Sequence, residues 1–433
     1  MAHRLHTRHP VPMLHASLAH DLTWLIGAAV ICGMLLRPWN LSEALWAAGG
    51  AALLVLGSLI STAQALRAVG RGTDVYLFLA GMMLLAELAR SEGLFDWVAA
   101  HAVRTAAGSP RRLFGLIYLV GIAVTALLSN DATAVVLTPA VYAAARQART
   151  EPLPYLLICA FIANAASFLL PISNPANLVV YASHLPPLGE WLAAFLVPSA
   201  AAIAVTFLVL RATQRAALGG AFTHAVPVPH LGRAGRLAAA GIGLTVVLLL
   251  WASASGRELG APTFAAAVLI LAAVIVFERR NPWPLLKGVS WSVLPLVAGL
   301  FVLVAALGRT GLLAALGVLL THLAHHAGGF AGFMAGGAVA LAGNVMNNLP
   351  VALIAAMLGA SHGLAALRAS MLIGVDLGPN LSVSGSLATI LWLIALRREK
   401  VHMDAMSFLK LGALVMPPAL LAALAVLAVG HAG

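Results

Sequence analysis

Long apolar segments separated by short polar connections fill most of the 433-residue chain. A helix of roughly 20 apolar residues crosses the hydrocarbon core of a bilayer. Strands of a transmembrane barrel would alternate polar and apolar residues, and these segments do not. The pattern predicts ten spans, at 22–36, 43–66, 74–90, 154–181, 187–210, 237–252, 262–277, 292–308, 366–396 and 408–430.

Two further apolar blocks, 113–147 and 329–360, carry polar clusters at their centres. The clusters are Ser129-Asn130-Asp131 in the first block and Asn344 with Asn347-Asn348 in the second. We interpret both blocks as re-entrant hairpins that return to the side they came from. The predicted fold is an all-α polytopic membrane protein of two inverted five-helix repeats, each with a re-entrant hairpin and a broken transmembrane helix.

The two halves resemble each other at an offset of 218 residues, which lays 80–94 on 298–312 and Asn130 on Asn348. After the shorter second connection the offset is expected to fall to 209, which lays Ser173 on Ser382. The shared order of polar interruptions indicates an internal repeat. We therefore expect an N-terminal tail (1–21), a first repeat (22–210), a cytoplasmic linker (211–236) and a second repeat (237–430).

Composition and charge agree with a membrane protein, since 61% of the residues are hydrophobic, 9% are charged and the mean hydropathy is +0.97. The net charge of +11 comes mostly from arginine in short connections, which marks the cytoplasmic side rather than a nucleic-acid site. With two hairpins these connections share one side and the N-terminus lies outside. We expect a multi-pass protein of a bacterial inner membrane that binds no nucleic acid.

Cofactor chemistry is not indicated. Cys32 and Cys159 lie in different apolar segments, which favours neither a disulfide nor a thiolate metal site. The chain has no phosphate-binding loop, so an ATP-driven step would need another subunit. Glu87 and Arg90 fall at the end of a span, where long side chains reach the interface, and structural roles are expected for them.

Asp131 is the only charged residue between Leu113 and Ala145. An ionisable group at membrane depth is costly and usually faces a cavity or a partner, so Asp131 is a functional candidate. The alternative is that Ser129, Asn130 or Asp131 caps the second arm of the hairpin.

The span 159–181 contains Pro171 and Pro175, which remove backbone donors and break the helix. The break carries three polar side chains, Ser173, Asn174 and Asn177. Discontinuous helices of this kind form substrate sites at the membrane midplane of transporters. A proline kink satisfied by its own side chains is the alternative for Asn174, and a polar contact between helices is the alternative for Asn164.

The second half repeats this device within 374–392, where Asp376 is the only charge between Ser370 and Leu396. Glycine and proline allow unwinding there, and the polar side chains offered are Asn380, Ser382, Ser384, Ser386 and Thr389. One lone carboxylate per half, each beside a polar break, is the pattern expected for ion or proton coupling. A cap on the broken helix is the alternative role of Asp376.

Three motifs resemble signatures of the arsenical pump membrane protein family, which are arsenite/antimonite efflux permeases of the ion transporter superfamily. The motifs are NDATAVVLTP (130–139), VMNNLPVALI (345–354) and DLGPNLSVSGSLATILWL (376–393), and the resemblance runs from about residue 22 to residue 430. It implies export of As(III) or Sb(III) in exchange for protons by alternating access. It also implies that a soluble arsenite-stimulated ATPase can associate with the protein.

The resemblance assigns roles to residues at the tips and breaks. Substrate contacts are expected from Asn130, Asn174, Asn177, Asn347, Asn348, Ser173, Ser384 and Ser386. Within this set Asn130 and Asn348 would hold As or Sb as its neutral hydroxide, and Asp131 and Asp376 would couple protons. Secondary candidates are Asn164, Asn344, Asn380 and Cys159.

Two positions depart from the family pattern, because Asn164 replaces an acidic residue and Asn380 replaces a lysine. If these charges interact in relatives, their joint loss is compensatory; if they carry protons, coupling here depends on Asp131 and Asp376.

Amides and hydroxyls suit arsenous acid, which is uncharged near neutral pH and both donates and accepts hydrogen bonds. The rival functions are sodium/proton antiport and dicarboxylate transport, and a membrane scaffold without transport is a third class.

Overall fold

The computed structural model describes residues 13–432 apart from 37, 182–184, 223–226, 280 and 361–363. All regular elements in these residues are helices. Seven helical segments of the described residues are long and apolar enough to cross a membrane, and the number rises to eight if α3 and α4, bent by 50° at their junction, count as one span. The prediction of an all-α polytopic membrane protein is confirmed.

The first half of the chain contains, in order, α1 (Met13–Leu36), α2 (Glu43–Leu56), α3 (Thr62–Gly70), α4 (Thr73–Ser91), α5 (Leu94–Thr105), α6 (Pro110–Leu127), α7 (Asn130–Ala132), η2 (Thr133–Leu137), α8 (Thr138–Gln147), α9 (Leu153–Ala165), η3 (Pro171–Ser173), α10 (Pro175–Val180) and α11 (Leu188–Thr213). The second half contains α12 (Arg233–Ala254), α13 (Gly260–Glu278), α14 (Trp283–Gly288), α15 (Val293–Arg309), α16 (Leu312–Ala327), α17 (Ala331–Met346), α18 (Asn348–Gly359), α19 (Arg368–Leu377), η6 (Gly378–Asn380), η7 (Val383–Gly385), α20 (Leu387–Arg398) and α21 (Ala405–Ala432). The short turns η1, η4 and η5 complete the described elements.

Several predicted boundaries differ from the structure, and two of the differences lie near the N-terminus. Helix α1 begins at Met13, inside the segment expected to be a tail. The predicted span 43–66 is two helices, because Ser58 adopts a left-handed φ of 56° after α2 and Ser61 opens α3 with a capping box. A positive φ in a residue with a side chain ends a right-handed helix, and hydropathy carries no sign of it.

The two halves pack on each other through corresponding helices. The offset of 218 relates α2 to α13 and α4 to α15, and the structure packs α2 on α15 and α4 on α13. The corresponding glycines Gly81 and Gly299 make these contacts close. A Cβ atom would lie 2.8 Å from the backbone of Thr263 at Gly81 and 2.6 Å from the backbone of Ala47 at Gly299. Small residues at these positions let the backbones approach.

The two interrupted blocks have matching tips. In the first, α6 ends at Leu127 and the Ser129 hydroxyl accepts a hydrogen bond from the backbone N–H of Ala132 at 3.2 Å. In the second, α17 ends at Met346 and the Asn347 side chain accepts from the N–H of Leu349 at 3.5 Å. The second arms begin at Asn130 and Asn348, as the offset of 218 predicts. We call 110–147 hairpin one and 331–359 hairpin two.

The two broken helices correspond at a different offset from the predicted one. Helices α9 and α19 end at Ala165 and Leu377, and the second arms begin after the caps Asn174 and Ser386, which gives an offset of 212 rather than 209. The offset of 209 was based on identical serine and leucine residues in the two halves, and such identities often arise by chance in apolar sequences. The caps fix the true register because they determine where each helix starts.

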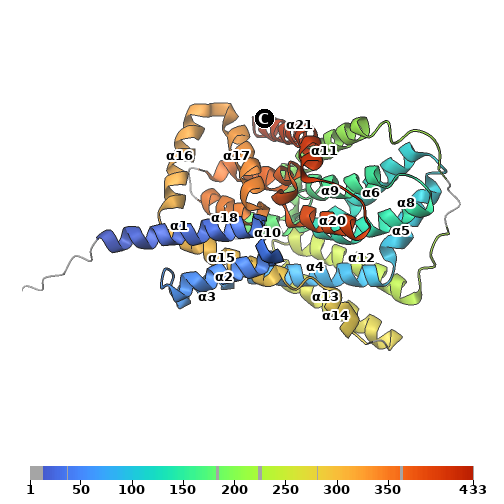
Figure 1. The fold of residues 1–433 in the computed structure, drawn as a ribbon, viewed down its shortest axis with the longest axis horizontal. Helices are drawn as coiled ribbons and strands as arrows, with labels where there is room; N and C mark the ends of the chain where they lie inside the picture. The colour runs from blue at the N-terminus through green and yellow to red at the C-terminus, as the bar shows by residue number, and fades with distance from the viewer. Residues whose placement is uncertain are drawn as a thin grey trace, which may run out of the picture.

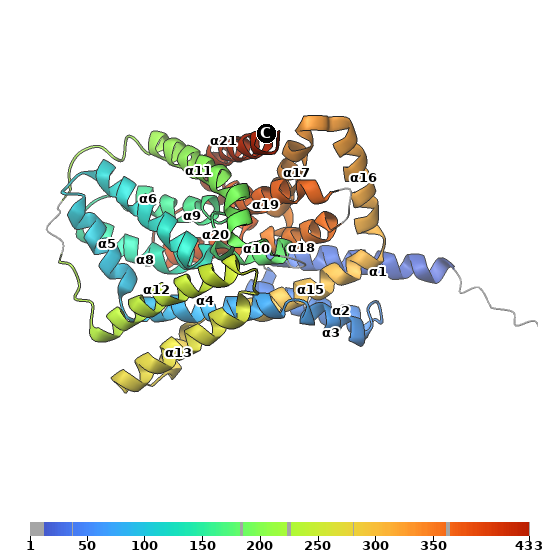
Figure 2. The ribbon, with the colours of Figure 1, turned by 180° about the vertical axis from the view of Figure 1, so that it is seen from behind.

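The arrangement in space places the hairpins apart and the breaks between them. Figures 1 and 2 both show α6 and α8 toward one end of the long axis and α16 and α17 toward the other, with α9, α10 and α20 between them, and Figure 2 shows α19 there as well. Helix α10 contacts α18 of hairpin two, and α20 contacts η2 of hairpin one. The second arm of each broken helix therefore contacts the hairpin of the other half, whereas the first arms, α9 and α19, pack on the hairpins of their own halves. The orientation of the hairpins in a membrane stays a prediction.

Candidate functional site

The two helix breaks meet in a buried side-chain contact between Asn174 and Asp376. The Asn174 amide Nδ2 donates to Asp376 Oδ1 at 2.6 Å, while its Oδ1 accepts from the Ala176 N–H at 2.9 Å and caps α10. Asp376 has no solvent exposure, and its second oxygen, Oδ2, has no hydrogen-bond partner among the described residues. A buried carboxylate oxygen of this kind is available for a proton or a donor group.

The two positions that depart from the family pattern also touch. Asn164 Nδ2 donates to Asn380 Oδ1 at 3.0 Å, and Asn380 Nδ2 donates to the carbonyl oxygen of Phe161 at 3.1 Å. Both side chains are buried. The contact joins α9 to the break of the second half, so Asn164 forms the polar contact between helices that was the alternative to ligand binding.

Hairpin two is tied to the second break through Asn344. The Ser382 hydroxyl donates to Asn344 Oδ1, and Asn344 Nδ2 donates to the carbonyl oxygen of Gly378 at 2.9 Å. Ser384 Oγ donates to the backbone carbonyl oxygen of Asn344 at 3.1 Å. Ser384 and Asn344 thus hold the hairpin against the unwound segment.

Three other candidates bond to the backbone around the breaks. Ser173 Oγ donates to the carbonyl oxygen of Ala126 in hairpin one at 3.1 Å. Asn177 Nδ2 donates to the carbonyl oxygen of Ser167 at 2.8 Å, and Ser386 Oγ accepts from the Thr389 N–H at 3.4 Å. These bonds satisfy groups that helix breaks leave without partners. Ser173, Asn177 and Ser386 therefore shape the site whatever else they contact.

Asp131 lines a cavity of about 60 Å³ together with Ser129 of its own hairpin and Pro175 at the first break. Because the Ser129 hydroxyl caps α7, the capping alternative is met by Ser129 rather than by the Asp131 carboxylate. The neighbouring Asn130 is 3% exposed, and Asn348 at the tip of hairpin two is 4% exposed. That Asn130 and Asn348 face one common substrate stays a prediction.

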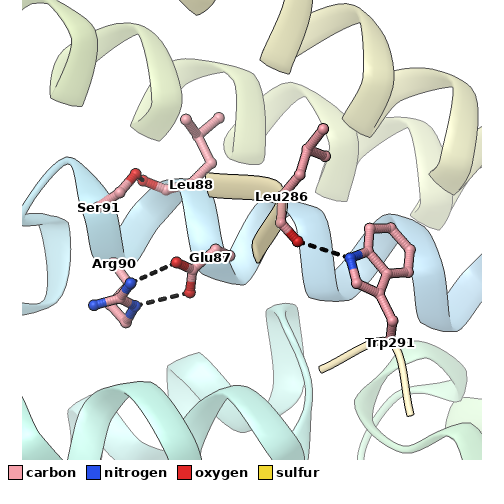
Figure 3. Close-up of polar contacts among 6 residues, drawn as sticks. All are labelled: Glu87, Leu88, Arg90, Ser91, Leu286 and Trp291. Carbon is pink, nitrogen blue, oxygen red and sulfur yellow. Dashed lines mark hydrogen bonds and ion pairs between the residues drawn. The ribbon is translucent and has the colours of Figure 1, made fainter. Parts of the chain in front are cut away.

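Glu87 on α4 is a polar residue of this cavity that the sequence interpretation placed in a merely structural role. Its side chain is 8% exposed and lines the same cavity as Asp131. Arg90 Nε donates to Glu87 Oε2 at 2.8 Å and Arg90 Nη2 donates to Oε1, as Figure 3 shows. The sequence did contain a feature that could have identified this pair. Glu87 and Arg90 are three residues apart, and side chains with this spacing are neighbours on one face of a helix.

Cys159 lies apart from this chemistry. Its side chain is fully buried in α9, and Sγ donates to the carbonyl oxygen of Tyr155 at 3.7 Å. The part of the chain that the structure describes holds no cluster of three or more His, Cys, Asp or Glu side chains suited to a metal ion. The groups gathered at the breaks and tips are amides, hydroxyls and carboxylates.

Comparison with known proteins places this chain in a family. Residues 24–374 match the model of the citrate transporter family. The chain is 30% identical to the arsenical pump membrane protein of Yersinia enterocolitica over 367 residues, which cover 80% of this chain and 84% of that protein. It is also 30% identical to an arsenical pump membrane protein of Escherichia coli over 362 residues, with the same two coverages.

A solved structure shares the fold. The YdaH transporter of Alcanivorax borkumensis superposes with a TM-score of 0.57 at 16% identity, covering 96% of this chain and 98% of that one. At this identity the likeness concerns the fold alone. The matches in sequence and the membrane-spanning candidate helices show that the chain is a multi-pass membrane transporter. The chain belongs to the arsenical pump membrane protein family, within the transporters that the citrate transporter model describes.

Proposed function

We propose that this protein exports arsenite or antimonite in exchange for protons, by alternating access of one central site. The observation that carries the proposal is the buried hydrogen bond between Asn174 and Asp376. It places a carboxylate with one unpartnered oxygen at the point where the broken helices of the two halves meet. A titratable group next to a substrate site lets the loss of a proton change the affinity for substrate.

The chemistry of the tips and breaks suits a small neutral hydroxide. Arsenous acid offers three hydroxyl groups, and Asn130, Asn174 and Asn348 supply amides that both donate and accept hydrogen bonds. The segments 127–139, 164–178, 344–350 and 376–389 contain no lysine or arginine. A neutral substrate needs no such charge. The relatives named as arsenical pump membrane proteins support this substrate class.

The second candidate is a carrier of citrate-like carboxylates, which the name of the matching family model favours. Such an anion would need positive charge or several helix N-termini at each carboxylate. The absence of cations from the four sequence segments makes this the weaker reading. Sodium/proton antiport differs from arsenite export and from carboxylate transport because it moves neither an arsenical nor an organic substrate.

The deciding experiment uses everted membrane vesicles that contain the full chain. An imposed pH gradient, acidic inside, should drive As(III) uptake measured by mass spectrometry of arsenic. Asp376→Asn vesicles with equal amounts of protein provide the matched control. Gradient-dependent citrate uptake without arsenite flux would replace the proposal by the second candidate.

The proposed ATPase partner is tested separately. Vesicles without ATP should already show the pH-driven flux. Adding a purified arsenite-stimulated ATPase and ATP should raise the flux only if the two proteins associate. No change on addition would remove this partner and leave the proton-coupled exporter standing.

A further inference from the structure

Two cavities that correspond under the internal repeat differ sharply in chemistry. We call the cavity lined by Glu87, Asp131 and Ser129 the acidic cavity. The counterpart cavity is lined by Arg71, Val179 and residues of α15 and α18, and has a volume of about 270 Å³. The acidic cavity lies against hairpin one and the counterpart cavity against hairpin two.

The offset of 218 relates several residues of their walls. The corresponding pairs are Ala86 and Val304, Glu87 and Ala305, and Val135 and Leu353. The offset of 212 for the broken helices relates Leu391 to Val179 in the same way. The two cavities are therefore versions of one feature, and the glutamate is present in only one of them.

The Glu87–Arg90 pair connects the acidic cavity to the outside of the molecule. The Glu87 side chain is 8% exposed, whereas the Arg90 side chain is 50% exposed. Two charged groups face Glu87 in the described structure: Arg90 on its own helix, and Asp131, which lines the same cavity. Asp96 of α5 acts electrostatically on Arg90. In the counterpart cavity Arg71 is the one charged lining residue among those described.

The space around Glu87 is kept open by a glycine. A Cβ atom on Gly288 would lie 2.0 Å from Glu87 Oε1, so any side chain there would displace the carboxylate. The remaining volume of about 60 Å³ is room for a few water molecules, each of which needs roughly 10–15 Å³ and two or more polar partners. Glu87, Asp131 and Ser129 supply such partners, whereas an apolar cavity of this size would stay dry.

We propose that Glu87, held by Arg90, is a positioning residue that keeps water in the acidic cavity, and that protons reach Asp131 through this water from the hairpin-one side. The counterpart cavity has Ala305 in place of Glu87, and the position that corresponds to Asp131 in the second half is Leu349. Neither carboxylate recurs in the second half, so proton access is one-sided. The use of this water by transport rests on the proposed function. The presence of the water does not.

The test reads the water directly. Hydroxyl radicals formed from water by X-rays oxidise nearby methionine, and Met82 and Met83 line the acidic cavity while Met357 lines the counterpart cavity. The full chain in lipid nanodiscs, without substrate, is irradiated and sulfoxide is quantified by peptide mass spectrometry. We expect Glu87→Leu to lower oxidation of Met82 and Met83 about ten-fold, as expected for loss of a buried polar partner. Glu87→Gln should keep the oxidation, and Met357 should be unaffected in both variants.

Two further variants keep the test decisive. Gly288→Ala displaces the Glu87 carboxylate without removing its charge, and it should also lower the oxidation of Met82 and Met83. This variant replaces Glu87→Leu in the test if Glu87→Leu does not fold. Ala305→Leu makes the matched change in the counterpart cavity and should leave Met82 and Met83 as they are. The inference would be overturned if Met82 and Met83 were oxidised equally in the parent protein, Glu87→Leu and Gly288→Ala. It would also be overturned if these two methionines were not oxidised in the parent protein.

A transport assay separates this inference from the proposed function. In proteoliposomes Glu87→Leu should slow pH-driven arsenite flux about ten-fold but keep arsenite–arsenite exchange, which moves no net protons. Equal loss of both fluxes would show a structural role and overturn the inference. A parent protein without arsenite flux would instead refute the proposed function, while the methionine oxidation would still report whether Glu87 holds water.

Discussion

The side chain of Asn164 donates a hydrogen bond to the side chain of Asn380 at 3.0 Å, across the boundary between the two halves of the chain. Family resemblance places an acidic residue and a lysine at these two positions. Their direct contact supports the interpretation that both charges were lost together as a pair. The neutral pair leaves Asp131 and Asp376 as the candidates for proton coupling.

Restoring one charge of that pair should harm the protein, and restoring both should rescue it. Asn164→Asp or Asn380→Lys alone buries a charge without a partner. An unpaired buried charge, like the one left when a buried ion pair loses one member, lowers the free energy of unfolding by about 3–5 kcal/mol. The double variant should recover most of this loss. Thermal unfolding in detergent, arranged as a double-mutant cycle, measures the coupling, and additive single effects would contradict it.

Asp376→Asn should remove proton coupling while preserving the fold. The asparagine Oδ1 can still accept from Asn174 Nδ2, so the contact between the breaks survives. We expect pH-driven arsenite flux to fall at least about ten-fold, with elution and melting temperature near those of the parent protein. Full pH-driven flux in this variant would exclude Asp376 from coupling.

Asp131→Asn should have the same effect on flux for a different structural reason. The Ser129 hydroxyl caps α7, so loss of the Asp131 charge leaves the start of the helix intact. Pure arsenite exchange should continue while gradient-driven export is lost, as measured in paired counterflow and uptake assays. If Asp131→Asn left every flux as it is in the parent protein, this prediction would be contradicted. A membrane scaffold that does not transport would give the same result.

Cys159→Ser should retain export. The thiol is buried, and its hydrogen bond to the Tyr155 carbonyl oxygen can also be made by a hydroxyl. We expect flux within about two-fold of the parent and a modest loss of stability from burying a more polar group. Loss of arsenite binding in this variant would reveal a thiolate route that the geometry does not favour.

Gly374→Ala should disrupt hairpin two. A Cβ atom there would lie 2.2 Å from the carbonyl oxygen of Gly336, where α19 and α17 touch. Overpacking of this kind costs about 1–3 kcal/mol, and it should lower both melting temperature and flux. Gly337→Ala is the matched control, because nothing lies within 4 Å of its added Cβ.

The sequence by itself determined the helical, membrane-spanning class of the chain and indicated a relation between its two halves. Apolar runs predicted membrane-crossing helices, although only seven or eight segments of the described residues are long enough to cross rather than the ten predicted. Polar interruptions marked the ends of α6 and α17, because a polar group at membrane depth is tolerated only where a cavity or a break receives it. The offset of 218 held at the tips and at Gly81 and Gly299, where the repeat is fixed by close backbone contact.

Only the tertiary structure decided which of these groups meet. The Asn174–Asp376 and Asn164–Asn380 contacts join residues more than two hundred positions apart, and no local pattern encodes such a pairing. Glu87 looked like an ordinary residue near a helix end until the fold set it beside Asp131 in one cavity. Hydropathy records whether a residue prefers lipid or water, whereas the partner of a buried polar group depends on how distant helices pack.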